Sequence, residues 1–175
     1  MHKKEAKFLL QDHAKVVQFV SLAGEVTGRK KLQKMIFIAK KMNFSFQEKY
    51  SFHMYGPYSE ELTVRVEELC NLGFMTERKE DKGSYVQYCY APTESGKEFT
   101  SILGEENPRL KSIIEKMNAK SSRFLELVAT LLYFDDLKRE EQIEKVKIVK
   151  AKLNYSTEEL QSGITFIYDY IITRQ

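Results

Sequence analysis

Residues 72–99 read LGFMTERKEDKGSYVQYCYAPTESGKEF, and this stretch limits the fold more than any other part of the chain. Two runs of extended character, 74–80 and 85–91, flank the turn-forming sequence DKGS. The second run is rich in tyrosine and valine, which favour strands. Thr93, or Ser95 with a glutamate three residues later, can cap a helix. The stretch therefore predicts a β-hairpin that leads directly into a helix.

Three helices are predicted before this hairpin. The first follows Asp12 as its cap and ends at Gly24, and the second follows Thr27 as its cap. The third begins after Ser59, behind the turn HMYGPYSEEL. Helix, helix, helix, hairpin, helix is the order of a winged helix-turn-helix. We therefore expect a mostly α (α+β) fold, with a winged helix-turn-helix-like domain at 1–103 that carries the hairpin as its wing.

The remainder of the chain, 104–175, has the pattern of helices alone. Asn107 before a proline predicts one helix start, and Ser156 followed by Glu159 predicts another through a capping box. Apolar residues recur at helical spacing through this region. We expect a C-terminal helical bundle that either forms a homodimer or extends the core, and the sequence leaves both alternatives open.

The charge and cysteine content exclude several classes of protein. The chain has 28 basic and 25 acidic residues, so a nucleic-acid-binding surface would have to come from local clustering of cations. Cys70 and Cys89 form neither a zinc-ligand set nor a disulfide framework, which is typical of a reducing cytosol. No apolar run is long enough for a membrane span. We expect a cytoplasmic protein without a membrane partner.

Motifs of catalysis are absent from the sequence. There is no phosphate-binding loop, dinucleotide-binding glycine motif, nucleophile elbow or zinc-protease motif. The three histidines have no metal-ligand spacing among them. We therefore expect a non-enzymatic protein with no catalytic residues, no metal site and no cofactor.

Cations cluster in the second predicted helix. Six lysines and arginines and no acid lie between Arg29 and Lys41. Such residues can contact phosphates without reading the base sequence, although a charge run is also typical of a solvated helix face. Cations of the predicted wing can add to this surface. The candidate phosphate-contacting residues are Arg29, Lys30, Lys31, Lys34, Arg78, Lys79 and Lys82.

The third predicted helix argues against the usual docking of a winged helix on DNA. It carries four glutamates and one arginine, and phosphates would repel such a helix from the major groove. Either DNA is approached through the second helix and the wing tip, or the fold binds a protein partner. For the second alternative, the candidate protein-binding residues are Tyr55, Pro57, Tyr58, Glu60 and Glu61.

Two stretches carry a family resemblance, GRKKLQKMIFIAKK at 28–41 and YSFHMYGPYSEEL at 50–62. In this order they resemble YwgA-type uncharacterised bacterial proteins and, more distantly, the Panacea (SocA-like) domain of toxin-neutralising antitoxins. The junction after the hairpin resembles winged-helix regulators of the multidrug-resistance repressor type. The resemblance covers 13–100 and implies a cytosolic, non-enzymatic domain of helical, partly winged-helix-like character. A nucleic-acid-binding regulator is the first expectation, and an antitoxin-like or phage-related inhibitor of another protein is the alternative.

Overall fold

The computed structural model describes the backbone of residues 2–172 and the side chains of residues 10–172. Its α-helices are α1 (His2–Ala23), α2 (Arg29–Lys41), α3 (Glu60–Asn71), α4 (Glu94–Phe99), α5 (Pro108–Asn118), α6 (Ser122–Tyr133), α7 (Arg139–Val149) and α8 (Thr157–Phe166). The short 3-10 helices are η1 (Thr100–Leu103) and η2 (Ala151–Leu153), and η3 (Ile167–Ile172) is a π-helix. The strands are β1 (Val26–Thr27), β2 (Ser51–His53), β3 (Gly56–Tyr58), β4 (Met75–Asp81) and β5 (Val86–Pro92).

Local capping explains where several of these helices begin. Ser59 and Thr93 accept hydrogen bonds from backbone amides in the first turns of α3 and α4. Asn107 does the same for α5, and Ser156 forms a capping box at the start of α8. Each side-chain oxygen satisfies an amide that has no partner within its helix. The predicted helix starts at Ser59, Asn107 and Ser156 are confirmed, and Thr93 is the cap of α4.

Two predicted caps are wrong. Asp12 lies inside α1, which begins at His2 because the preceding residues KKEAKFLLQ are mostly good helix formers. Thr27 does not cap α2, since it belongs to β1 and pairs with Cys89. Gly28 occupies the capping position of α2, and because glycine has no side chain, this helix start has no side-chain cap.

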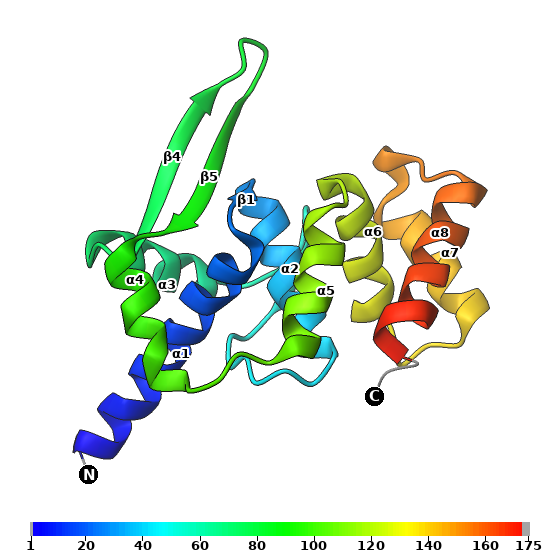
Figure 1. The fold of residues 1–175 in the computed structure, drawn as a ribbon. Coiled ribbons are helices and arrows are strands. Elements are labelled where there is room, and N and C mark those ends of the chain that lie inside the picture. The colour runs from blue at the N-terminus through cyan, green and yellow to red at the C-terminus, as the bar shows by residue number, and fades with distance from the viewer. Residues whose placement is uncertain (1, 173–175) are drawn as a thin grey trace.

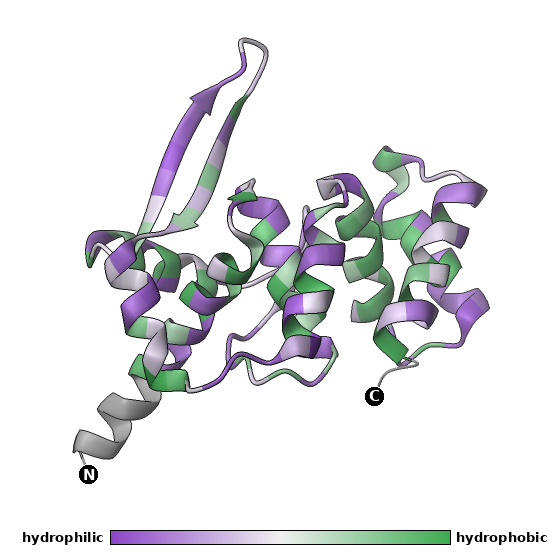
Figure 2. Ribbon diagram, viewed as in Figure 1, coloured by the Kyte–Doolittle hydropathy of each residue, from purple (hydrophilic) through white to green (hydrophobic). Residues whose placement is uncertain are grey.

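The main sheet has three antiparallel strands in the order β1-β5-β4. β4 and β5 form the predicted hairpin, in register from Met75 opposite Pro92 to Asp81 opposite Val86. Figure 1 shows this hairpin projecting well beyond the helices, and Figure 2 shows that β4 is largely hydrophilic. β1 extends the sheet only at the base of the hairpin, where Val26 pairs with Tyr90.

A second, smaller hairpin lies between α2 and α3 in the sequence. Its strands β2 and β3 pair with Phe52 opposite Pro57, and Gly56 adopts a positive φ of 83° just after the turn. β3 packs against both α2 and α6. A side chain at Gly56 would meet Thr130 and Glu126 of α6, so this turn favours glycine for its backbone angle and is closely surrounded.

The core is built around α2. Residues 32–39 of this helix are all buried, and α6 packs against it. One hydrophobic cluster contains side chains from both parts of the chain, such as Ile36 from α2 and Leu127 from α6. The molecule is therefore a mostly helical α+β structure in which the C-terminal helices contribute to the common core. Within residues 2–172, no helix combines the length and the apolar character needed to cross a membrane.

Candidate functional site

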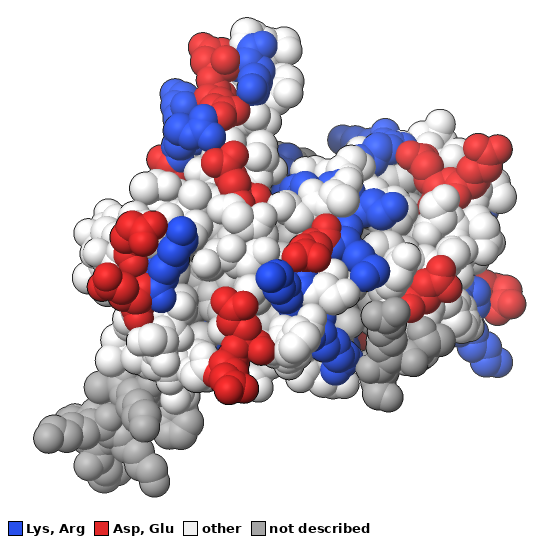
Figure 3. All heavy atoms as spheres, viewed as in Figure 1, with Lys and Arg blue, Asp and Glu red and all other residues white. Residues whose placement is uncertain are grey.

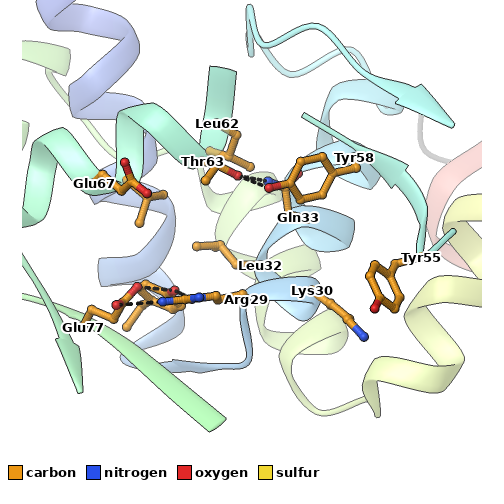
Figure 4. Close-up of a pocket in the computed structure, with 12 residues that line it drawn as sticks. Arg29, Lys30, Leu32, Gln33, Tyr55, Tyr58, Leu62, Thr63, Glu67 and Glu77 are labelled. Carbon is orange, nitrogen blue, oxygen red and sulfur yellow. Dashed lines mark hydrogen bonds and ion pairs between the residues drawn. The ribbon is translucent and has the colours of Figure 1, made fainter. Parts of the chain in front are cut away.

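A cavity of about 280 Å³ lies where α2, α3 and the two hairpins meet. α2 and α3 supply its apolar floor, and polar side chains surround the opening (Figure 4). It brings together residues that the sequence placed in two separate candidate sites. The lining residues are Arg29, Lys30, Leu32, Gln33, Tyr55, Tyr58, Leu62, Thr63, Val66, Glu67, Glu77 and Tyr90.

The wall on the side of the large hairpin is a hydrogen-bonded group of three charged and phenolic side chains. The Arg29 guanidinium donates to Glu77 at 3.1 Å and to the Tyr90 hydroxyl at 3.2 Å. Tyr90 in turn donates to Glu77 at 2.6 Å. Burial and the neighbouring Glu77 raise the pKa of Tyr90, so its hydroxyl stays protonated as a donor. Arg29 also stacks on the Tyr88 ring, 3.7 Å from its centroid, and its charge is compensated within the protein.

The wall between α2 and α3 depends on Gln33. Its side-chain amide donates to the Ser59 carbonyl at 2.9 Å and accepts from the Ser59 amide at 2.9 Å. Both groups of Ser59 are buried, so these two bonds satisfy backbone atoms that water does not reach. Gln33 thereby fixes the start of α3 relative to α2.

Lys34 of α2 binds the backbone of the small hairpin. Its side chain is 1% exposed, and its ammonium group donates to the Pro57 carbonyl at 2.7 Å. Burial lowers the pKa of Lys34 to about 8, an effect that Glu126 opposes and that Lys150 and Lys30 strengthen. A buried ammonium that is bonded to a backbone carbonyl cannot contact a phosphate. The predicted phosphate-contacting role of Lys34 is therefore wrong.

Lys150 holds the same hairpin from the C-terminal part of the chain. Its ammonium group donates to the Met54 carbonyl at 2.7 Å and to Glu126 at 2.9 Å. Lys150 is buried, and Glu126 compensates its charge. Sequence reasoning missed Lys150 and Glu126, because nothing in the charge pattern of 137–153 distinguishes this lysine from its exposed neighbours.

The small hairpin that borders the cavity is thus fixed by groups from distant parts of the sequence. A protein of Bacillus subtilis (strain 168), described as uncharacterized protein YwgA, is 55% identical over 159 residues. These residues are 91% of this chain and 96% of that protein. This chain belongs to the YwgA family. The predicted YwgA-type resemblance is confirmed, and no protein-family model matches the chain.

The remaining predicted cations of this YwgA-family chain do not form one basic surface. Lys30 is exposed and lies over the Tyr55 ring, with its nitrogen 3.4 Å from the ring centroid. Lys31 donates to the Asn118 carbonyl at 2.7 Å and is partly buried. Burial also lowers the pKa of Lys31. Of the cations predicted on α2, Arg29 and Lys30 line the cavity, while Lys31 and Lys34 bind backbone carbonyls.

The cations of the large hairpin are surrounded by carboxylates. Arg78 pairs with Glu25 and Glu80, and Lys82 pairs with Glu80 at 3.1 Å. Lys79 is exposed on β4. Figure 3 shows acidic and basic side chains lying next to one another on the projecting hairpin. The hairpin therefore presents a surface of mixed charge.

The residues predicted to contact a protein in the YwgA-family chain differ in exposure. Tyr55 is 47% exposed at the tip of the small hairpin, and Glu60 and Glu61 are exposed at the start of α3. Tyr58 is half-buried, and its hydroxyl lies 2.6 Å from that of Thr63. Pro57, which was also predicted to bind a protein, is buried beneath the surface.

Among residues 10–172 no group of three or more histidine, cysteine, aspartate and glutamate side chains is arranged to hold a metal ion. The chemistry that the cavity of this YwgA-family chain offers is hydrogen bonding, charge pairing and contact with aromatic and aliphatic groups.

Proposed function

We propose that this YwgA-family chain is a non-enzymatic protein-interaction module that binds a partner protein through α3 and the adjoining cavity. The observation that carries this proposal is the charge of α3. Its exposed surface presents Glu60, Glu61, Glu67 and Glu68, whereas its single arginine, Arg65, is partly buried in an ion pair with Glu48. A surface of this charge repels phosphates and attracts a basic protein surface.

The winged-helix-like arrangement that we propose for residues 1–103 is supported by the order of the elements. α1, α2 and α3 precede the β4–β5 hairpin, and β1 joins that hairpin on the β5 side. In proteins that use a helix-turn-helix on DNA, the second helix of the motif enters the major groove. The corresponding α3 is acidic here, which favours the use of this arrangement for a protein partner.

The experiment is affinity capture from a bacterial lysate with the purified full chain as bait, quantified by mass spectrometry. Three baits are compared: wild type, Glu60→Lys/Glu67→Lys, and the matched control Glu105→Lys/Glu106→Lys in the exposed loop before α5. We expect a protein that is retained by wild type and by the control and lost at least tenfold with the α3 variant. Equal retention of every captured protein by the three folded baits would contradict the proposal.

A nucleic-acid-binding regulator is the second candidate, and the projecting β4–β5 hairpin favours it. This hairpin carries the exposed Lys79, and Lys30 is exposed at the start of α2. The test is a salt titration of binding to random-sequence duplex DNA, followed by fluorescence anisotropy. Micromolar binding that weakens steeply with salt and is lost in Lys30→Glu/Lys79→Glu would support this candidate over the first. Lys34 is left unchanged because reversing a buried charge would disturb the fold.

A further inference from the structure

We infer that the cavity receives one large apolar side chain from a peptide segment of the partner, next to a lysine or arginine that pairs with Glu67. This inference rests on the proposed function and specifies the chemistry of the segment that binds. Three features of the cavity carry it: its floor, its rim and its size.

The floor of the cavity is apolar. Leu32 from α2 and Leu62 and Val66 from α3 line it, and all three are almost fully buried. An aliphatic or aromatic side chain placed on this floor would remove its own apolar surface from water, which favours binding. The exposed Tyr55 ring lies at the edge of the cavity and can cover such a side chain.

The rim carries an uncompensated carboxylate. Arg29 and Glu77 neutralise each other at 3.1 Å, whereas no ion pair or hydrogen bond engages the carboxylate of Glu67 within residues 10–172. Figure 4 shows Glu67 and Lys30 on opposite sides of the cavity, with Leu32 between them. Glu67 is continuous with the acidic surface of α3, so a cation on the incoming segment has the complementary charge.

The size of the cavity is sufficient for one large side chain. Its volume is about 280 Å³, close to the lower end of the range of about 300–1,000 Å³ that is usual for ligand pockets. One large side chain fills such a space, while its backbone and neighbours remain on the surface. A helix or an extended segment with a single apolar anchor meets this requirement.

The test begins with selection of a random peptide library displayed on phage against the immobilised full chain. Selected peptides are then synthesised, and their affinities are measured by fluorescence anisotropy for wild type, Glu67→Lys and Glu106→Lys. Glu106 is the matched control, because it is an exposed glutamate in the loop before α5 and lies outside both α3 and the cavity. We expect peptides in which a large apolar residue stands within three or four positions of a lysine or arginine.

Glu67→Lys should weaken binding of these peptides at least tenfold, and Glu106→Lys should change it less than threefold. Replacing the peptide cation by glutamate should restore binding to Glu67→Lys and weaken binding to wild type. This exchange of preference would not result from partial unfolding of the variant. Thermal denaturation of each variant shows that the fold is retained.

Several outcomes would overturn the inference. Peptides that bind wild type and Glu67→Lys equally would place the docking site elsewhere and leave the proposed function standing. Failure of the folded wild type to select any peptide would overturn a peptide-binding cavity, while the lysate experiment decides on a partner protein separately. A dimer in light scattering that Glu67→Lys dissociates would identify the occupant as a second copy of the chain. Thermal stabilisation by a free amino acid, lost in Glu67→Lys, would identify a small ligand instead.

Discussion

Lys34 and Lys150 bind the same small hairpin from opposite parts of the chain. Lys34 donates to the Pro57 carbonyl and Lys150 to the Met54 carbonyl, each at 2.7 Å. Both lysines are buried, and Glu126 lies close enough to influence both charges. The hairpin that borders the cavity is therefore held by α2 on one side and by the C-terminal helices on the other.

Removing the Lys150 charge should destabilise the protein strongly. Lys150→Met keeps the length of the side chain but leaves Glu126 without its 2.9 Å partner and the Met54 carbonyl without its donor. Loss of one partner of a buried pair costs about 3–5 kcal/mol. Urea denaturation measures the free energy of unfolding. Lys147→Met, at an exposed pair with Glu144, is the control and should cost less than about 0.5 kcal/mol. Equal effects of the two substitutions would contradict this role of Lys150.

Lys34 should make stability rise with pH between 7 and 9.5. Its pKa is about 8 in the folded protein and 10.5 ordinarily, so in this range the unfolded chain binds more protons at this site. Raising the pH therefore favours the folded state, by about 2 kcal/mol from this group. The measurement is urea denaturation of wild type and Lys34→Met at both pH values. Between pH 7 and 9.5, the difference in unfolding free energy between wild type and Lys34→Met should change by about 2 kcal/mol. Equal pH dependence of the unfolding free energy in the two proteins would contradict the lowered pKa of Lys34.

Gly96→Ala should destabilise the protein although alanine favours helices. A Cβ atom at Gly96 in α4 would lie 1.9 Å from the Phe74 carbonyl oxygen, at the base of the large hairpin. Backbone must move to admit it, and we expect a cost of about 3 kcal/mol or more. Gly163→Ala in α8 is the control, since its Cβ would meet the Leu127 side chain at 3.3 Å and that side chain can shift. Thermal denaturation should show a large decrease in Tm for Gly96→Ala and a small change for Gly163→Ala.

Gln33→Met should loosen the start of α3. Methionine has a similar length but cannot bond to the buried amide and carbonyl of Ser59. The Ser59 carbonyl keeps the Thr63 amide as a donor, but the Ser59 amide loses its acceptor, which should cost about 1–3 kcal/mol. Urea denaturation measures the total effect, and hydrogen exchange of the Ser59 amide should become faster. The exposed Gln47 offers a control, and Gln47→Met should leave both quantities nearly unchanged. Unchanged exchange at Ser59 in Gln33→Met would count against the role described.

The elements that could be predicted from the sequence depend on near neighbours. The β4–β5 hairpin follows from a glycine-containing turn between two strand-like runs, and the caps at Ser59 and Asn107 act on amides two or three residues away. β1 was not predicted, because two residues are too few for a strand pattern and its partner Tyr90 is distant in sequence. That pairing also explains why Thr27 is not a helix cap.

The candidate site was predicted only in part. Arg29 and Tyr55 were assigned to alternative surfaces, and the structure places them on one cavity because α2 packs against the small hairpin. The burial of Lys34 could not be predicted from helical spacing, since its acceptor lies 23 residues away. Lys150 binds an acceptor 96 residues away, and a local charge pattern cannot indicate a contact between residues so far apart in the sequence.

The charges of Lys34, Lys150 and Glu126 depend on one another, so a substitution at one of these positions requires compensating substitutions at the others. Replacing Lys150 alone leaves the Glu126 carboxylate without its ion-pair partner. Replacing Glu126 alone leaves the ammonium groups of Lys34 and Lys150 without their shared counter-charge. Lineages should therefore keep positions 34, 126 and 150 as a set or exchange them as a set. The Tyr55 side chain at the hairpin tip takes no part in this arrangement, so its position is free to diverge independently of these three residues.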